Sequence, residues 1–200
     1  MTNINPRKLH GGWFEGYALD LHTLSSEFLG YDAYGHPDFA TKRSELGELL
    51  YKLKNKSDKS VIPHIIDAVV NFLNFEWKIS SKIEGIIPIP PSKTVRALQP
   101  VIELAKGISS AVGVKLYSDY LIKGKDTQEL KNIYDFHERM EVLKDIYDVQ
   151  YDTLLDKNIL LFDDLYRSGA TLNAATNVLY KKGKVGRVYV LALTKTRSLR

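Results

Sequence analysis

One short segment, Ile159–Leu172, constrains the fold more than any other part of the sequence. It reads ILLFDDLYRSGATL and begins with four apolar residues, 159–162, which predict a buried strand. Asp163 and Asp164 follow at the carboxyl end of that strand, where open α/β sheets bind their ligands. A loop over 165–170 comes next, and helical spacing begins directly after it. The pattern predicts a strand, a ligand-binding turn and a helix of a parallel α/β sheet.

Small and hydroxyl-bearing residues occupy the turn between the predicted strand and helix. Gly169 lets the backbone approach a ligand closely, and Ser168 and Thr171 add hydroxyl donors. The unpaired amides of a helix N-terminus favour a phosphate. Carboxylates such as Asp163 and Asp164 accept hydrogen bonds from vicinal hydroxyls, so the pattern is typical of a site for a ribose 5-phosphate group. The alternative is a solvated acidic turn in which Ser or Thr caps the helix.

Alternating strands and helices continue along the chain. Short apolar runs predict strands, and apolar residues three and four apart predict helices, the first of them capped by Ser44. The alternation with short links predicts an α/β fold, with a parallel sheet of four or five strands and helices on both faces. The expected strands are 17–21, 86–90, 114–117, 159–162 and 188–193, and the expected helices are 43–53, 63–78, 95–112, 126–147 and 171–182.

The N-terminal part lacks this regular alternation. We expect its first dozen residues to form a loose arm and 32–37, DAYGHP, to form a turn. The expected organisation is one compact domain, in which 1–80 form an N-terminal hood with flanking helices and 81–200 form the core.

Composition excludes several classes of protein. The absence of cysteine rules out disulfides, thiolate zinc sites and cysteine nucleophiles. No stretch approaches the roughly 18 apolar residues of a membrane span, and the polar N-terminus lacks the apolar core of a signal peptide. We therefore expect a cytoplasmic protein with no membrane partner. The net charge of +4 fits an anionic ligand or nucleic acid. Dinucleotide, P-loop and serine-hydrolase motifs are absent.

The segment 159–172 resembles the phosphoribosyl-pyrophosphate (PRPP) signature of type I phosphoribosyltransferases, with four apolar residues, two acids and a loop ending in Gly-Ala-Thr. The wider chain is similar to the ComF-like, amidophosphoribosyltransferase-like branch, which carries a Pro-x-Pro strand end matched here by 87–90. It departs from that branch in lacking a four-cysteine zinc element. Its stretch after the Pro-x-Pro strand, 91–99, is short, and only Gln99 corresponds to the branch's motif there.

The resemblance implies a type I phosphoribosyltransferase fold. It also implies transfer of the phosphoribosyl group of PRPP to a small nitrogen acceptor, with release of pyrophosphate and with Mg²⁺ as cofactor. Asp163 and Asp164 would orient the ribose as the catalytic pair, with Mg²⁺ held near them through PRPP and not by protein ligands of its own.

The resemblance further assigns three groups of binding residues. The 5-phosphate would be bound by Arg167, Ser168, Gly169, Ala170 and Thr171; the pyrophosphate by Pro91, Ser92, Lys93 and Arg96; and a flexible closing loop would carry Lys123, Lys125, Thr127, Gln128, Lys131 and Arg139.

Other readings of the sequence stay open. A protein of this kind can sense PRPP or a nucleotide without turnover, or act as a competence-type accessory factor in DNA uptake. The basic runs 52–56, 181–184 and 195–200 could contact nucleic acid or form solvated surface. His22 could line the site, and a homodimer is open as well.

Overall fold

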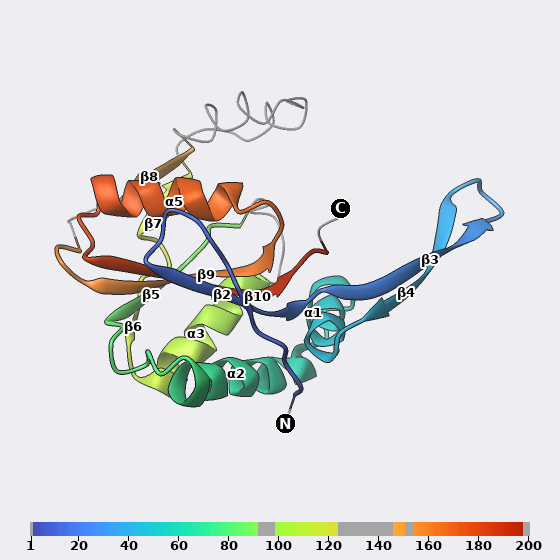
Figure 1. The fold of residues 1–200 in the computed structure, drawn as a ribbon, viewed down its shortest axis with the longest axis horizontal. Helices are drawn as coiled ribbons and strands as arrows, with labels where there is room; N and C mark the ends of the chain where they lie inside the picture. Colours follow the sequence, from blue (N-terminus) through green and yellow to red (C-terminus); the bar gives the residue numbers. More distant parts are fainter. Residues whose placement is uncertain (1, 92–98, 124–145, 151–153, 198–200) are drawn as a thin grey trace.

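The computed structural model describes residues 2–91, 99–123, 146–150 and 154–197. Its centre is a six-stranded sheet in the order β1-β2-β10-β9-β5-β6 (Figure 1). Only β1 runs antiparallel to its neighbour, and the other five strands are parallel. The predicted α/β class with a mainly parallel sheet is therefore confirmed. The strands are β1 (Arg7–Lys8), β2 (Glu15–Leu21), β5 (Gly85–Pro88), β6 (Lys115–Leu116), β9 (Asn158–Tyr166) and β10 (Arg187–Lys195).

The strand β9 is a continuous apolar run because both faces of the sheet are covered at its position. Residues 159–162 are fully buried between β10 and β5. The strand is longer than predicted, because its ladder with β10 continues past the acids and pairs Tyr166 with Lys195. The expected loop over 165–170 is thus wrong at its start, and only 167–169 separate β9 from the next helix.

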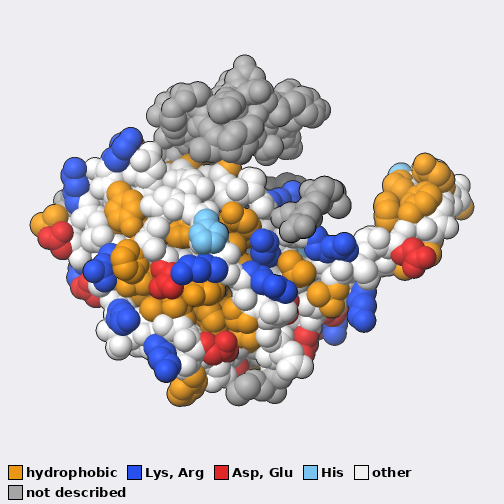
Figure 2. All heavy atoms as spheres, viewed as in Figure 1, with side chains coloured by type: hydrophobic (Ala, Val, Ile, Leu, Met, Phe, Trp, Pro, Cys, Tyr) orange, Lys and Arg blue, Asp and Glu red, His pale blue; other side chains and the backbone are white. Residues whose placement is uncertain are grey.

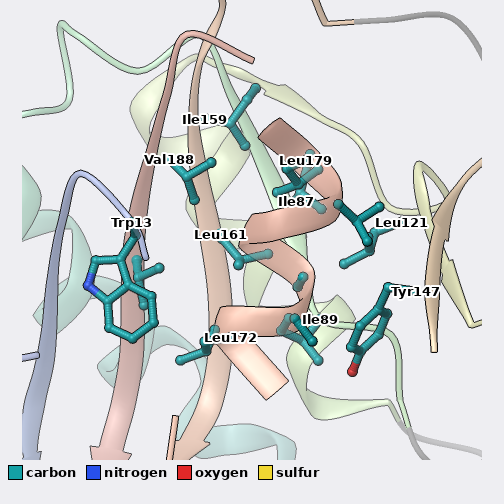
Figure 3. Packing of buried hydrophobic residues seen from close by; sticks show 14 of the residues in the cluster. Trp13, Ile87, Ile89, Leu121, Tyr147, Ile159, Leu161, Leu172, Leu179 and Val188 are labelled. Atoms are coloured by element: carbon teal, nitrogen blue, oxygen red, sulfur yellow. The ribbon is translucent and has the colours of Figure 1, made fainter. Parts of the chain in front are cut away.

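Helices cover both faces of the sheet (Figure 1). On one face α5 packs over Leu161 and Val188 (Figure 3). On the other face the helices α1, α2 and α3 share a second hydrophobic cluster with Leu160 and Phe162. The helical segments are α1 (Glu45–Asn55), η1 (Lys59–Val61), α2 (Ile62–Asn71), η2 (Phe72–Glu76), α3 (Pro100–Val112) and α5 (Ala170–Lys181). No helix in the described ranges is long and apolar enough to cross a membrane.

The predicted helices differ from these in three places. Where one helix was expected over 63–78, α2 ends at Asn71 and the π-helical segment η2 follows up to Glu76. The third begins at Pro100, and most of its expected first turn, 95–98, lies outside the described residues. The helix expected over 126–147 also lies outside them, except for its last two residues, and Tyr147 begins a strand instead. That strand, β8 (Tyr147–Val149), pairs antiparallel with β7 (Leu121–Lys123).

The N-terminal region holds more strand than the sequence indicates. The first dozen residues are not all a loose arm, because Arg7–Lys8 pair with β2 and Leu9 is buried. The turn at 32–37 joins β3 (Thr23–Tyr31) to β4 (Pro37–Arg43), and this hairpin projects away from the body (Figure 1). Hydrophobic side chains gather on its outer end (Figure 2).

Strands from the N-terminal part belong to the central sheet. The strand β2 lies between β1 and β10, and α1 and α2 pack in the same cluster as α3. The expected division at residue 80 stays a prediction.

The helix α1 approaches the end of β2 very closely. Ser44 caps the helix as predicted, accepting a hydrogen bond from the Gly47 amide at 3.0 Å. The Ser44 hydroxyl also donates to the Leu21 carbonyl at 2.5 Å. Gly47 faces the backbone carbonyl of His22 with no room for a side chain between them. Glycine at this position lets α1 lie against the carboxyl end of the sheet.

We predict that Gly47→Ala destabilises the protein by about 1–3 kcal/mol, the usual cost of overpacking. The added Cβ meets backbone, which cannot move aside as a side chain can. The control is Gly107→Ala in α3, where the Cβ meets only the flexible end of Ile66. Urea unfolding of both variants provides the measurement, and equal midpoints for Gly47→Ala and the parent protein would contradict the close approach.

Candidate functional site

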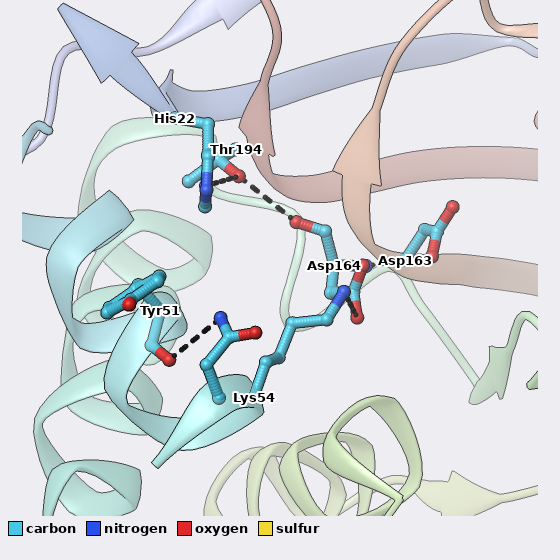
Figure 4. Close-up of polar contacts among 7 residues, drawn as sticks. His22, Tyr51, Lys54, Asp163, Asp164 and Thr194 are labelled. Carbon is cyan, nitrogen blue, oxygen red and sulfur yellow. Dashed lines mark hydrogen bonds and ion pairs between the residues drawn. The ribbon is translucent and has the colours of Figure 1, made fainter. Parts of the chain in front are cut away.

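The two acids emerge on opposite faces of the sheet at the carboxyl end of β9. Successive side chains of a strand alternate in direction. Leu161 packs on the α5 side and Phe162 on the α1 side, so Asp163 turns toward α5 and Asp164 toward α1. The Asp164 amide donates to a carboxylate oxygen of Asp163 at 2.8 Å, which fixes the two side chains relative to each other (Figure 4).

Asp164 is nearly buried and forms an ion pair with the N-terminal part of the chain. The ammonium group of Lys54, on α1, lies 2.8 Å from Asp164 Oδ2 (Figure 4). Thr194 Oγ1, on β10, donates to the Asp164 backbone carbonyl at 3.3 Å. His22 Nδ1 lies 3.2 Å from the same Thr194 oxygen. Residues from α1, β10 and the end of β2 are therefore linked to Asp164 on β9.

Asp163 has a different electrostatic environment. Removal from water, followed by the negative charge of Asp164, raises the pKa of Asp163 to about 7. The positive charges of Lys54 and Lys123 oppose this shift. Burial lowers the pKa of Lys123, and burial together with the Asp163 charge raises the pKa of the Tyr147 hydroxyl. Asp163 is therefore partly shielded from water and lies near Lys123 and Tyr147. A further cation beside it would stabilise its ionised form.

The turn after β9 has the backbone shape that its sequence predicts. Gly169 has a φ of 80° and forms the N-cap of α5. A side chain there would collide with the ring of Tyr166. Asn173 supports the turn, because its side-chain amide donates to the Gly169 carbonyl at 2.9 Å. The N-cap Gly169 has no side chain to cap α5, and the Ala170 amide donates to the Ser168 hydroxyl at 3.4 Å.

The structure brings together part of the predicted site. Arg167 and Ser168 are exposed in the turn, and Ala170 and Thr171 begin α5, all beside the two acids. Lys123 ends β7 close to Asp163. Pro91 is half-buried in the segment after β5, which leaves the sheet beside β9, since the Ile89 amide donates to the Phe162 carbonyl at 2.8 Å. Ser92, Lys93, Arg96, Lys125, Thr127, Gln128, Lys131 and Arg139 lie outside the described residues.

Sequence reasoning missed several residues at this edge of the sheet. Lys54 stands in the basic run 52–56, which gives no hint that one of its members reaches an acid 110 positions away. Thr194 lies inside an apolar strand, and Tyr147 falls in a stretch that was expected to be helical. Apolar and polar residues alternate along β2, and Leu19 on this strand is buried. This alternation is the sequence signal that His22, which directly follows β2, reaches the sheet edge.

The raised pKa of Asp163 predicts a specific dependence of the protein's stability on pH. Its pKa is higher in the folded state than the ordinary 3.8, so the folded protein binds the proton more tightly between these values. The carboxyl group therefore favours folding in acid and loses that contribution as pH rises through about 7.

We predict that Asp163→Asn, which is neutral at every pH, is more stable than the parent at pH 8. The gain should shrink toward zero at pH 4. The expected rise in Tm at pH 8 is at least about 2–4 °C, the effect of 1 kcal/mol in a chain of this size. Thermal unfolding from pH 4 to 8 measures it, with the exposed Asp67→Asn as control. A gain that does not vary with pH would contradict the buried environment.

Comparisons with known proteins complete the description of this site. No family model and no curated protein matches the sequence. Solved structures similar to the chain include adenine phosphoribosyltransferase from Leishmania tarentolae (TM-score 0.48, 10% identity, 96% of this chain and 94% of that one). Others are adenine phosphoribosyltransferase from Saccharomyces cerevisiae (0.46, 13%, 85% and 85%) and orotate phosphoribosyltransferase from Aeropyrum pernix (0.44, 12%, 87% and 88%). At such identities and TM-scores, these likenesses assign no activity to this chain.

Proposed function

We propose that this chain is a type I phosphoribosyltransferase that binds PRPP with Mg²⁺ and transfers its phosphoribosyl group to a nitrogen acceptor. One observation carries the proposal. Asp163 and Asp164 stand at the end of a central parallel strand, and a three-residue turn links that strand to the open N-terminus of α5. Carboxylates and a phosphate cradle at this spacing match a ligand with vicinal hydroxyls next to a phosphate.

The turn at 167–169 and the start of α5 are proposed to bind the 5-phosphate. Backbone amides at the helix N-terminus and the positive end of its dipole favour an anion there. The left-handed backbone of Gly169 turns the chain into the helix. The exposed guanidinium of Arg167 adds a positive charge beside the same turn. Binding of this remote phosphate positions the reacting carbon of the ribose.

The ribose hydroxyls are proposed to face the two acids. Lys54 holds Asp164 Oδ2 at 2.8 Å, and the carboxylate keeps further lone pairs for ligand hydroxyls. Asp163, between Lys123 and Tyr147, faces the other side of the ribose. Each carboxylate is thus held in a defined position before a ligand arrives.

The carboxylates of the site suit a Mg²⁺ ion that is bound mainly by the phosphates of PRPP. No group of three or more His, Asp or Glu side chains in the described ranges could hold a metal ion by itself. Mg²⁺ usually takes one or two carboxylates together with substrate phosphates and water. Asp163 fits that role, because burial and the Asp164 charge raise its pKa, so that a nearby cation would favour its ionised form. The bound ion would neutralise charge that develops on the leaving pyrophosphate.

The pyrophosphate is proposed to lie at the segment that follows β5. This segment leaves the sheet next to the acids and carries Ser92, Lys93 and Arg96 a few residues later. Lys123, close to Asp163, would provide a further cation. In the reaction the acceptor nitrogen attacks C1 of the ribose, and the bond from C1 to the pyrophosphate oxygen breaks. Closure by the loop that carries Lys125 and Arg139 would exclude water from this centre.

We predict that PRPP with Mg²⁺ stabilises the protein against heat. At about 100 times its dissociation constant a ligand adds about 2.7 kcal/mol, which corresponds to roughly 5–10 °C in Tm. Asp164→Asn should lose most of this shift, because an amide replaces the charge-assisted bonds to the hydroxyls poorly. Asp67→Asn, on the exposed side of α2, should keep it. No shift in the parent protein at millimolar PRPP would contradict the proposal.

We also predict that Gly169→Ala weakens PRPP binding at least tenfold. The Cβ would push Tyr166 or the phosphate away from the amides of α5. The matched control is Gly113→Ala, because Gly113 has a similar φ of 73° but open space around it. Both variants carry the same backbone strain, so isothermal titration with PRPP and Mg²⁺ separates strain from the loss of the phosphate site. Equal affinities for the two variants would place the phosphate elsewhere.

Turnover distinguishes a transferase from a protein that only senses PRPP. The assay follows pyrophosphate release from PRPP and Mg²⁺ with adenine, hypoxanthine, orotate or ammonia as acceptor. Release with any of these supports the transferase. Binding of PRPP without release across this panel would instead favour the sensor.

A further inference from the structure

His22 lies just beyond the carboxyl end of β2 and reaches the strand next to it. Its backbone amide donates to the Lys195 carbonyl at 2.8 Å, which holds the residue against β10. Its ring nitrogen Nδ1 lies 3.2 Å from Thr194 Oγ1. The side chain extends toward the space that Tyr51, Lys54 and Asp164 surround (Figure 4). His22 therefore stands on the α1 side of the site, next to the carboxylate that is proposed to orient the ribose.

The hydrogen bonds of Thr194 decide which nitrogen of His22 carries the proton. The Thr194 hydroxyl has a single proton, which it donates to the Asp164 carbonyl at 3.3 Å. In this arrangement the same oxygen accepts from His22, which favours the tautomer with the proton on Nδ1. In a neutral ring Nε2 consequently keeps a free lone pair. The threonine thus selects the tautomer of the histidine.

The charges around His22 keep this ring neutral near pH 7. Burial is the largest effect that lowers its pKa below 6.5, and three cations add to it. Asp164, on β9, acts in the opposite direction. The cations come from three parts of the chain: Arg43 on β4, Lys54 on α1 and Arg167 in the turn before α5.

We propose that Nε2 of His22 is the general base that takes the proton from the attacking nitrogen of the acceptor. The inference rests on the proposed transfer reaction and names a catalytic residue for it. The acceptor nitrogen gives its electron pair to C1 of the ribose. The bond from C1 to the pyrophosphate oxygen breaks, and its electron pair leaves with the pyrophosphate. The N–H proton of the acceptor moves to Nε2, and the imidazolium later returns it to solvent.

The position of His22 also places the acceptor within the site. Asp164 would hold the ribose from the β9 side, so we place the acceptor on the side of Tyr51 and Lys54, where it can meet C1. The ring of Tyr51 is fixed by the guanidinium of Arg43, which lies 3.8 Å from its centroid. The acceptor would thus enter between α1 and the end of β2, with its N–H directed at Nε2.

The tautomer can be tested without knowing the acceptor. Nitrogen NMR of the ¹⁵N-histidine-labelled protein should show His22 with a protonated Nδ1, an unprotonated Nε2 and a pKa below 6.5. His22→Asn identifies its signals. Thr194→Ser keeps the hydroxyl oxygen and should keep this tautomer. Thr194→Val removes the oxygen that accepts the hydrogen bond from Nδ1, so both tautomers of His22 should then be populated. A protonated Nε2 in the parent protein would overturn the inference.

The second test measures catalysis. His22→Asn keeps an amide that can donate to Thr194 but has no counterpart of Nε2. This variant should bind PRPP as the parent does and release pyrophosphate about 10²–10⁴ times more slowly at pH 7. In the parent the rate should decrease at acid pH as His22 is protonated, and in the variant this decrease should be absent. His64→Asn, on the exposed surface of α2, should match the parent.

The outcomes of these tests separate the two proposals. If the parent binds PRPP and releases pyrophosphate with adenine, hypoxanthine, orotate or ammonia, while His22→Asn keeps the parent's rate and pH profile, the base is wrong and the transferase stands. If the parent protein does not bind PRPP, the proposed transferase function is wrong, and the assignment of His22 as its general base is wrong as well.

Discussion

The parallel ladder between β9 and β10 positions everything else in this site. It continues beyond the apolar run 159–162 and therefore carries two acids, in strand geometry, out of the core to the sheet edge. The same ladder brings Thr194 beside the Asp164 backbone. Because β9 is buried between β10 and β5, the backbone that carries these polar groups is held rigidly. A turn of only three residues then leads to α5, so the phosphate cradle is held by the same strand.

The alternation of side chains along this strand gives the two acids unlike surroundings. Asp164 meets Lys54 at 2.8 Å and takes part in the network that includes His22. Asp163 meets Lys123 and Tyr147 on the far face and carries a raised pKa. Adjacent residues of one type thus acquire different chemistry from the helices and strands on each side. The proposed site depends on this difference, since a ribose and its leaving group present different faces.

The sequence predicts the local parts of this arrangement well. Residues 159–162, the glycine turn and the Ser44 cap follow from short patterns that the structure confirms, because neighbours in the chain determine them. The hairpin of β3 and β4 was missed, since most of its residues are exposed and no apolar alternation marks it. Lys54 reaches the site only through non-local packing, which depends on the bare backbone of Gly47 against the His22 carbonyl. No short pattern in the sequence indicates that contact, whereas the alternation of β2 does point to His22.

The place of β2 in the sheet has a consequence for how the chain folds. Its parallel partner β10 is the last strand in the described part of the chain, so the ladder between them joins residues more than 170 positions apart. Such a pairing closes a very long loop and is slow to form. During synthesis β2 emerges long before its parallel partner and has only β1 as a neighbour until residues 187–195 leave the ribosome. Leu19 of β2, which is fully buried in the folded protein, lacks much of its covering over this interval, and that makes the interval the period of greatest risk of aggregation.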